Sequence, residues 1–254
     1  MNTITRRTLI LERLDSEGEC HVMRMADDLG VSPMTIRRDL DALEKEGRVL
    51  RTHGGAAPAG RVAFAFQFLQ RENEQSAAKL AIGILAASLV QDGQSVLLDS
   101  GTTTLAVARE LKARRKLTVI TTSLPIASEL QHSDAAELIL LGGNLRRETP
   151  DLIGALTEMN LEQLRADVAF IGAEAVDAGG TVFSSSLAVA RLLKKMAASA
   201  RQVHIVADST KIGRSALARF GVLKNWSGLI TDNGIAAAVA QKLGRAGVRV
   251  IRAK

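Results

Sequence analysis

The segment at residues 31–40, V-S-P-M-T-I-R-R-D-L, constrains this chain more than any other feature. Ser32 is a favourable helix N-cap, and Pro33 fits the first helical position because the N–H that it lacks would be unpaired there. Three apolar residues then recur at helical spacing and form one face, namely Ile36, Leu40 and Leu43. The segment therefore predicts a short helix with one side that packs against the protein.

The other side of this predicted helix carries polar and basic residues. At about 100° per residue, the positions opposite the apolar face are Met34, Arg38, Asp41 and Lys45. Thr35 and Arg37 lie on its flanks. Insertion into the major groove of DNA requires such a two-sided helix, whereas an ordinary surface helix with its charges in water is the alternative. The residues expected to contact DNA from this segment are Ser32, Met34, Thr35, Arg37 and Arg38.

The flanking sequence favours a winged helix-turn-helix of nearly 60 residues. Residues 26–31 predict a short helix closed by Gly30, which supplies the first helix and the turn of the motif. Residues 3–15 form another amphipathic stretch, and we expect it to close the small core with Ile4, Leu11 and Leu14. After Glu46 and Gly47, residues 48–55 alternate like a β-ribbon, and the residues expected to reach phosphates from this wing are Arg48, Arg51 and His53.

Composition limits the kinds of partner and compartment. The 254-residue chain has a net charge of +6, yet residues 1–60 hold nine lysines and arginines against ten acidic residues, a net charge of −1. DNA binding must then depend on the placement of individual arginines, and we expect two copies of the DNA-binding domain to act together. Cys20 is the single cysteine, which predicts neither a disulfide framework nor a zinc site. The sequence contains no membrane span and no signal-peptide pattern, so we expect a cytoplasmic protein. An aromatic content of 3% disfavours stacking on single-stranded bases.

The chain is expected to divide into a DNA-binding domain at residues 1–57, a linker at 58–75 and an α/β domain at 76–254. The linker contains a cluster of phenylalanines, Phe64, Phe66 and Phe68, which is expected to pack in a core or against a partner subunit. Helical patterns lie at residues 78–90, 105–111, 124–130, 157–164, 187–200 and 235–243. Continuous apolar runs lie at residues 95–98, 117–120, 137–141, 168–171, 203–207, 228–230 and 248–251. This alternation predicts an open, mostly parallel sheet buried on both faces by helices.

Polar loops follow the predicted strands and are expected to gather at the carboxyl edge of the sheet, where open α/β proteins bind ligands. The loops cover residues 99–104, 121–123, 142–147, 172–173, 208–211 and 231–232. The first loop opens into a helix near Leu105, which makes it an anion site, with Lys211 or Arg146 as counter-charge and Asp99 or Asp208 as acceptors for hydroxyl groups. Each loop taken singly is explained as an ordinary turn or cap. Together they predict a small hydroxylated anion with its phosphate on residues 100–104.

The motifs T-I-R-R-D-L and R-T-H-G-G-A, at residues 35–40 and 51–56, closely resemble the N-terminal domain of the DeoR family of bacterial repressors of sugar and polyol metabolism. The sensor domain of that family is matched by Lys79, Asp99 to Thr103, Gly142, Gly143, Gly154, Asp167, Phe170, Gly172 and Asp208 to Lys211. The resemblance implies a fold similar to ribose-phosphate isomerases and a phosphorylated sugar or polyol as inducer. It departs at Val189 and Leu193, where family members carry a Glu and a Lys, so the identity of the inducer is not carried over.

Residues and resemblance together assign an effector site to the α/β domain. Its expected members are Lys79, Asp99, Ser100, Gly101, Thr102, Thr103, Thr122, Gly142, Gly143, Arg146, Gly172, Asp208 and Lys211. The expected function is repression of a sugar or polyol catabolic operon, relieved by the phosphorylated sugar, with double-stranded operator DNA as partner and a homodimer or homotetramer as the active form. No metal, cofactor or membrane is expected to take part.

The alternative is a sugar-phosphate isomerase with an appended DNA-binding domain. Candidate general bases for such an enzyme are Asp99, Asp208 and Glu174. The histidines that would otherwise act as bases are scattered along the chain, at His21, His53, His132 and His204. We therefore expect no enzymatic activity.

Overall fold

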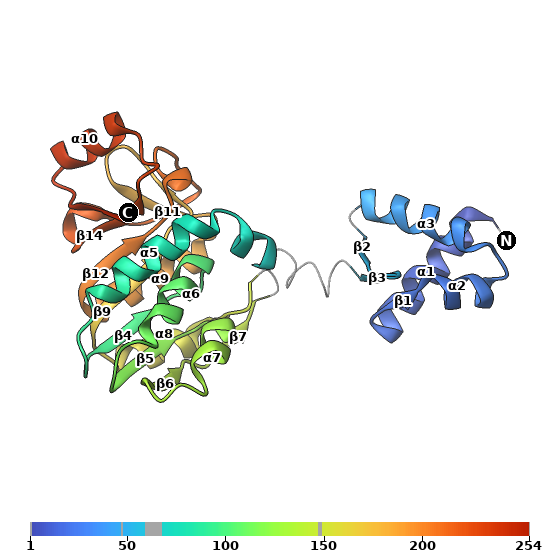
Figure 1. The fold of residues 1–254 in the computed structure, drawn as a ribbon, viewed down its shortest axis with the longest axis horizontal. Coiled ribbons are helices and arrows are strands. Elements are labelled where there is room, and N and C mark those ends of the chain that lie inside the picture. The colour runs from blue at the N-terminus through green and yellow to red at the C-terminus, as the bar shows by residue number, and fades with distance from the viewer. Residues whose placement is uncertain (1, 47, 59–67, 147–148, 254) are drawn as a thin grey trace. The chain divides into compact units, whose positions relative to one another are not determined.

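The computed structural model describes residues 2–46, 48–58, 68–146 and 149–253. The chain forms two compact units, Met1–Gln70 and Arg71–Lys254 (Figure 1). The division falls inside the segment 58–75 that the sequence suggested as a linker. Of the three linker phenylalanines, Phe68 is buried, whereas Phe64 and Phe66 lie outside the described residues. No helix in the described ranges is long and apolar enough to span a bilayer.

The N-terminal unit is a winged helix-turn-helix. Its elements are α1 (Thr3–Glu17), β1 (Cys20–His21), α2 (Val22–Leu29), α3 (Pro33–Lys45), β2 (Val49–Thr52) and β3 (Gly55–Pro58). Asn2 caps α1 by accepting a hydrogen bond from the Thr5 N–H at 2.8 Å, and Gly30 ends α2 in the left-handed conformation with φ 63°. The strands pair antiparallel in the order β1-β3-β2, so the expected two-stranded ribbon gains a third strand, β1, from the residues just before α2.

The core of this unit confirms the apolar face of α3, since Ile36, Leu40 and Leu43 are at most 1% exposed. The expectation for Ile4 is wrong, because its side chain is 80% exposed. Ile10 and Leu14, four residues apart, form the inward face of α1. Ile4 precedes Ile10 by six residues, which rotates it by about 120° away from that face.

The C-terminal unit contains a seven-stranded sheet that is parallel throughout, in the order β15-β14-β12-β9-β4-β5-β6. Its strands are β4 (Ser95–Leu98), β5 (Leu117–Thr121), β6 (Ala136–Leu140), β9 (Ala166–Gly172), β12 (Ala200–Val206), β14 (Gly228–Asp232) and β15 (Val250–Ala253). All seven expected strands are present. Burial on both faces is wrong for β6, where Leu140 is 41% exposed, because this strand forms an edge with one neighbour.

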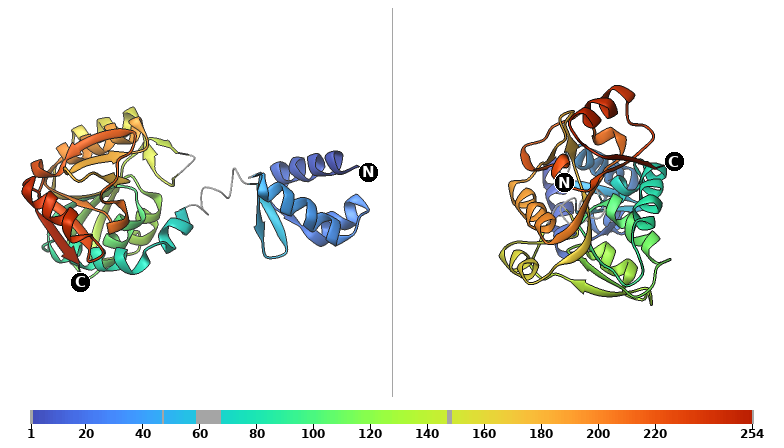
Figure 2. Two further views of the ribbon diagram at one scale, coloured as in Figure 1. Left: turned by 90° about the horizontal axis from the view of Figure 1, so that it is seen from above. Right: turned by 90° about the vertical axis from the view of Figure 1, so that its left-hand side faces the viewer.

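Helices cover both faces of the sheet (Figure 2). They are α5 (Ser76–Ser88), α6 (Thr102–Leu111), α7 (Leu124–Leu130), α8 (Ala155–Glu162), α9 (Leu187–Ala198) and α10 (Ala237–Arg245). On one face α5 packs against α6, and on the other α9 packs against β9 and β12. At Gly83 of α5 a Cβ atom would lie 2.8 Å from the Ala106 carbonyl oxygen, so glycine permits the close approach of α5 to α6.

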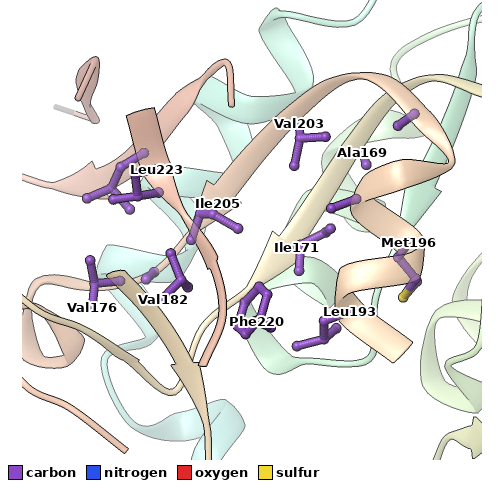
Figure 3. Close-up of a cluster of buried hydrophobic side chains, with 14 of the residues drawn as sticks. Ala169, Ile171, Val176, Val182, Leu193, Met196, Val203, Ile205, Phe220 and Leu223 are labelled. Carbon is purple, nitrogen blue, oxygen red and sulfur yellow. The ribbon is translucent and has the colours of Figure 1, made fainter. Parts of the chain in front are cut away.

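A small antiparallel sheet, absent from the sequence-based expectation, packs over the α9 face. It consists of β10 (Ala175–Val176), β11 (Thr181–Ser184) and β13 (Ala218–Val222), and a further two-stranded ribbon consists of β7 (Asn144–Leu145) and β8 (Leu152–Ile153). Val182 of β11 and Phe220 of β13 meet Ile171 and Ile205 of the large sheet in the main core (Figure 3). The α9 side of the large sheet therefore has an additional layer that the sequence analysis did not predict.

Candidate DNA-binding surface and effector site

The expected recognition helix is α3, and it begins as the sequence predicted. The Ser32 hydroxyl accepts a hydrogen bond from the Thr35 N–H at 3.2 Å, which caps the helix. The Met34 side chain is 53% exposed, and Arg37 and Arg38 are exposed as well. The side of α3 opposite the buried apolar face thus presents a methionine and two guanidinium groups to solvent.

A buried carboxylate that sequence reasoning missed fixes α3 against α1. Asp39 is 3% exposed and accepts hydrogen bonds from the Arg6 Nε at 2.5 Å and the Arg7 Nε at 3.2 Å. Arg7 also lies 3.4 Å from Glu46 at the end of α3. The position of Asp39, one residue before Leu40 on the apolar side, was the available signal. Its role is to hold the recognition helix in place.

The wing is the β2–β3 hairpin, with the exposed residues Arg48 and His53 at its base and tip. The Arg51 side chain is instead 26% exposed, with its Nε 3.7 Å from the Asp41 carboxylate of α3. Gly55 is required by packing, since a Cβ atom there would lie 1.8 Å from the Cys20 carbonyl oxygen of β1. The paired glycines of the R-T-H-G-G-A motif therefore serve a turn and a strand contact. Gly47 lies outside the described residues.

In the C-terminal unit, the loop after β4 leads directly into α6. Gly101 is the N-cap, and α6 starts at Thr102, three residues before the expected start at Leu105. The Thr104 hydroxyl donates to the carbonyl oxygens of Asp99 at 3.1 Å and Gly101 at 3.0 Å, which closes the loop. The first N–H groups of a helix have no intrahelical acceptors and carry partial positive charge. This loop accordingly has the geometry of an anion site.

Asp99 is the first residue of this loop, and its side chain is buried. Its Oδ2 accepts a hydrogen bond from the Gly172 N–H at 2.9 Å, and its buried Oδ1 has no partner among the described residues. Burial of the side chain raises the pKa of Asp99 to about 6. Asp99 and Gly172 therefore join the ends of β4 and β9, and only one of the two carboxylate oxygens is used in this contact.

Asp99→Asn is expected to stabilise the protein at alkaline pH. Folding raises the carboxyl pKa from 3.8 to about 6, so the folded protein binds the proton more tightly than the unfolded chain does. The ionised group thus lowers stability as pH rises from about 4 to about 6, and the loss persists above that range. Removing the charge should raise the free energy of unfolding by up to about 3 kcal/mol at pH 8 and far less at pH 4. Denaturant unfolding at both values measures this, and an equal effect at both would contradict it.

Arg146, expected as a counter-charge for the ligand, is paired within the protein. Its Nε and Nη2 lie 2.7 and 2.8 Å from the two carboxylate oxygens of Asp151, which is 1% exposed. The Ser100 hydroxyl also donates to Asp151. Sequence reasoning missed Asp151. It neutralises Arg146 and ties the 99–104 loop to the segment that follows β7.

The loop after β12 lies at the same carboxyl edge of the parallel sheet as the loop after β4. Asp208 is buried and accepts a hydrogen bond from the Thr210 N–H at 3.0 Å, which caps the short helical turn Ser209–Lys211. The carboxylate of Asp232, the last residue of β14, accepts hydrogen bonds from the Ser209 N–H at 2.6 Å and the Gly234 N–H at 2.8 Å. Burial opposes ionisation of Asp232, but these hydrogen bonds prevail and lower its pKa. Lys211 is half-buried at the end of the turn.

Three further predicted effector residues, Thr122, Gly142 and Gly143, have structural partners. Thr122 is buried, and its carbonyl oxygen accepts from the Leu152 N–H at 2.9 Å. Gly142 donates to the Asn160 side chain at 3.2 Å, and a Cβ atom at Gly143 would lie 2.1 Å from the Thr157 hydroxyl. Gly143 therefore permits close packing of the loop after β6 against α8, whereas a Cβ atom at Gly142 would make only an ordinary contact, 3.8 Å from the Asn160 side-chain oxygen.

Two other sequence-based candidates, Glu174 and His204, have partners that are not part of the 99–104 loop. Glu174 accepts hydrogen bonds from the Ser184 hydroxyl at 3.2 Å and the Ser185 N–H at 2.9 Å. His204 lies within β12 and stacks on Phe170 at 5.7 Å, and burial lowers its pKa to about 4. Among the described residues, no three His, Cys, Asp or Glu side chains gather as a metal site would require.

Val189 and Leu193, the two departures from the family pattern, occupy the inward face of α9. Their side chains are 8% and 6% exposed and belong to the main core cluster. Figure 3 shows Leu193 beside Phe220 in that cluster. Apolar residues at these positions fill the space between α9 and the small antiparallel sheet.

An exposed recognition helix on one unit and convergent polar loops on the other define a DNA-binding regulator with a separate sensor domain. The chain belongs to the DeoR family. Residues 6–60 match the DeoR-like helix-turn-helix domain, and residues 74–233 match the DeoR C terminal sensor domain.

Known proteins agree with this assignment. The chain is 36% identical to the HTH-type transcriptional regulator GlpR of Haloferax volcanii, over 97% of this chain and 96% of that protein. It is 35% identical to the lactose phosphotransferase system repressor of Lactococcus lactis (92% and 93%) and 30% identical to the glycerol-3-phosphate regulon repressor of Escherichia coli K12 (96% of each). Similar solved structures include ribose 5-phosphate isomerase A from Methanocaldococcus jannaschii, with a TM-score of 0.41 and 21% identity over 54% of each chain.

Proposed function

We propose that this protein represses a sugar or polyol catabolic operon and releases its operator when a phosphorylated sugar binds the C-terminal unit. The observation that carries the proposal is the loop Asp99–Thr104, where a buried carboxylate lies beside the start of α6. Phosphate on the N–H groups and a hydroxyl on Asp99 would suit this pairing. The names of two relatives, repressors of a lactose phosphotransferase system and of a glycerol-3-phosphate regulon, support the same class of inducer. We place its action on double-stranded DNA in the cytoplasm.

The isomerase alternative would assign a general base to Asp99, Asp208 or Glu174. Asp208 accepts a hydrogen bond from Thr210 of its own turn, and Glu174 accepts two from Ser184 and Ser185 at the end of β11. Asp99 also accepts one, from Gly172, but its Oδ1 has no partner among the described residues, so it is the remaining candidate. A carboxylate at this edge equally serves to recognise a hydroxyl, and the family consists of transcriptional regulators. We therefore propose no catalytic role and no cofactor. Isomerase assays with ribose 5-phosphate and fructose 6-phosphate test this, and turnover by the purified chain would overturn it.

Arg38→Ala is expected to weaken operator binding without unfolding the protein. Arg38 projects from the exposed side of α3, so its guanidinium is free to reach a guanine edge or a phosphate in the major groove. If it contacts a base, the loss should be about 1–3 kcal/mol with relaxed preference at one base pair. Fluorescence anisotropy with operator variants measures both quantities.

The matched control for this experiment is Arg201→Ala. Arg201 is exposed on β12 and lies 3.6 Å from Asp167, so its loss removes the same charge from the C-terminal unit. Operator affinity should stay near that of the original protein. If Arg38→Ala binds the operator as tightly as Arg201→Ala does, the proposed docking of α3 is incorrect.

We also propose that the active form is a homodimer or homotetramer. A DNA-binding unit with a net charge of −1 gains affinity when two copies engage two half-sites. On α5, Leu80 and Ile84 are 51% and 52% exposed, and Lys79, its one charged residue, is buried. A charge-free face suits contact between two copies of a basic domain, which would otherwise repel each other.

Light scattering is expected to show an oligomer, and footprinting should show half-sites about one helical turn apart or a multiple of it. Both measurements use the full chain. A monomer that binds the operator tightly would contradict the proposal.

A further inference from the structure

Two cationic side chains of the effector-binding unit hold the segment at residues 71–74, which directly follows the division between the two units. The Lys79 ammonium of α5 donates to the Glu74 carbonyl oxygen at 2.6 Å and also to the carbonyl oxygen of Arg71. The Arg109 guanidinium of α6 lies 2.7 Å from the Glu72 carboxylate. The chain that leads to the DNA-binding unit is therefore fastened at its backbone and at a side chain.

The Lys79 ammonium, which makes the contact with the backbone, is also influenced by charges of the predicted effector loop at residues 208–211. Lys79 is 7% exposed, and burial lowers its pKa. Among neighbouring charges, the Asp208 carboxylate raises that pKa and the Lys211 ammonium lowers it. An anion bound beside Lys211 would add a negative charge in reach of the same ammonium. The attraction of the Lys79 ammonium toward the loop at 208–211 would then change relative to its attraction toward the carbonyl groups of Arg71 and Glu74.

The side-chain contact lies on the helix that begins at the other effector loop. Arg109 belongs to the last turn of α6, and the first turn of α6 follows Gly101. A ten-residue helix spans about 15 Å and moves as a rigid rod, so a displacement at one end reaches the other. Arg109 also donates to Glu129 of α7 at 3.1 Å, which leaves Glu72 and Glu129 as the two carboxylates around its guanidinium.

We propose that Lys79 and Arg109 are positioning residues that transmit occupancy of the effector site to the segment 71–74, through the Arg71 and Glu74 carbonyl groups and the Glu72 carboxylate. The inference rests on the proposed function of the effector site. It assigns to Lys79 a coupling role in place of direct recognition of the inducer. Allosteric coupling requires such a shared element, whose arrangement differs between the two ligand states.

Glu72→Gln tests the transmission role, because it removes a charge from the segment without touching either ligand site. Inorganic phosphate, glycerol 3-phosphate, ribose 5-phosphate and fructose 6-phosphate are first compared by thermal shift on the full chain. The compound with the largest rise in Tm is then titrated by calorimetry, and operator affinity is measured with and without it. A coupling of about 5–150-fold is typical of allosteric proteins. Glu72→Gln should bind the compound and the free operator as before, yet lose most of that coupling.

Lys112→Met is the matched control. Lys112 follows α6 directly and pairs with Glu129 but not with Glu72, so its loss should leave the coupling intact. Lys79→Met should lose the coupling as Glu72→Gln does, and circular dichroism confirms that each variant is folded. If Glu72→Gln responds as fully as the original protein, or Lys112→Met loses as much, the transmission role is wrong. If the original protein itself shows no response to any compound, the proposed function fails.

Discussion

Asp39→Ala should destabilise the DNA-binding unit by about 3–5 kcal/mol and abolish operator binding, because it removes the buried carboxylate that accepts hydrogen bonds from both Arg6 and Arg7. Asp39 is 3% exposed and Arg6 is 8% exposed, and they meet at 2.5 Å between α3 and α1. Breaking one side of a buried ion pair costs much more than the pair contributes over an apolar substitute. The recognition helix would also lose its polar contacts with α1, although the apolar contacts of Ile36, Leu40 and Leu43 would remain. Since small domains are only marginally stable, a loss of this size should unfold the DNA-binding unit at physiological temperature.

Thermal unfolding followed by circular dichroism measures this effect, together with operator affinity below the transition. Glu46→Ala is the matched control, since Glu46 is 49% exposed on its side chain and contacts Arg7 at 3.4 Å. Exposed pairs of this kind contribute about 0–1 kcal/mol. Unfolding temperatures for Asp39→Ala and Glu46→Ala that agree with each other would show that the buried pair does not hold α3.

The parts of the structure that the sequence predicted are those set by local patterning. The apolar spacing of Ile36, Leu40 and Leu43 identifies the buried face of α3, and Ser32 with Pro33 identifies its start. Continuous apolar runs identified all seven strands of the large sheet. Burial on two faces leaves no alternation in the inner strands, whereas the edge strand β6 is partly exposed. The observed boundaries of these elements differ from the expected ones by a few residues, as at the start of α6.

Long-range pairing of polar groups was not predictable in this way. Asp39 lies within a run of charged residues, and only the fold shows that Arg6, more than thirty residues away, reaches it. For Arg146, which the sequence suggested as a counter-charge for a ligand, only the fold shows that Asp151 pairs with its guanidinium. The small sheet was missed because β10 has only two residues and because β11 pairs with the distant β13, where Thr181 lies opposite Val222. Local spacing carries no information about such partners.

Gly101→Val is expected to abolish the response to the inducer while leaving operator binding intact, which would give a repressor that stays on its operator. Gly101 has φ −156°, so valine meets no backbone strain there. A Cβ atom at Gly101 would lie 3.3 Å from the Thr104 hydroxyl and 3.8 Å from Asp99 Oδ1, between the helix start and the carboxylate. The branched side chain would extend over the N–H groups proposed to hold the phosphate. Because charge-assisted hydrogen bonds to phosphate are about twice as strong as neutral ones, their loss should remove most of the affinity.

Calorimetry with glycerol 3-phosphate, ribose 5-phosphate and fructose 6-phosphate measures the loss of binding, and anisotropy with operator DNA measures the loss of release. Gly179→Val is the matched control, because a Cβ atom there also meets a side-chain oxygen at 3.3 Å, that of Asp177 in the turn before β11. The control should respond to the inducer as the original protein does, since this turn is remote in sequence from both effector loops. Unphosphorylated ribose should bind far more weakly than ribose 5-phosphate, because it lacks the anion that α6 would hold. A folded Gly101→Val protein that still leaves the operator on addition of the sugar phosphate would place the site elsewhere in the C-terminal unit.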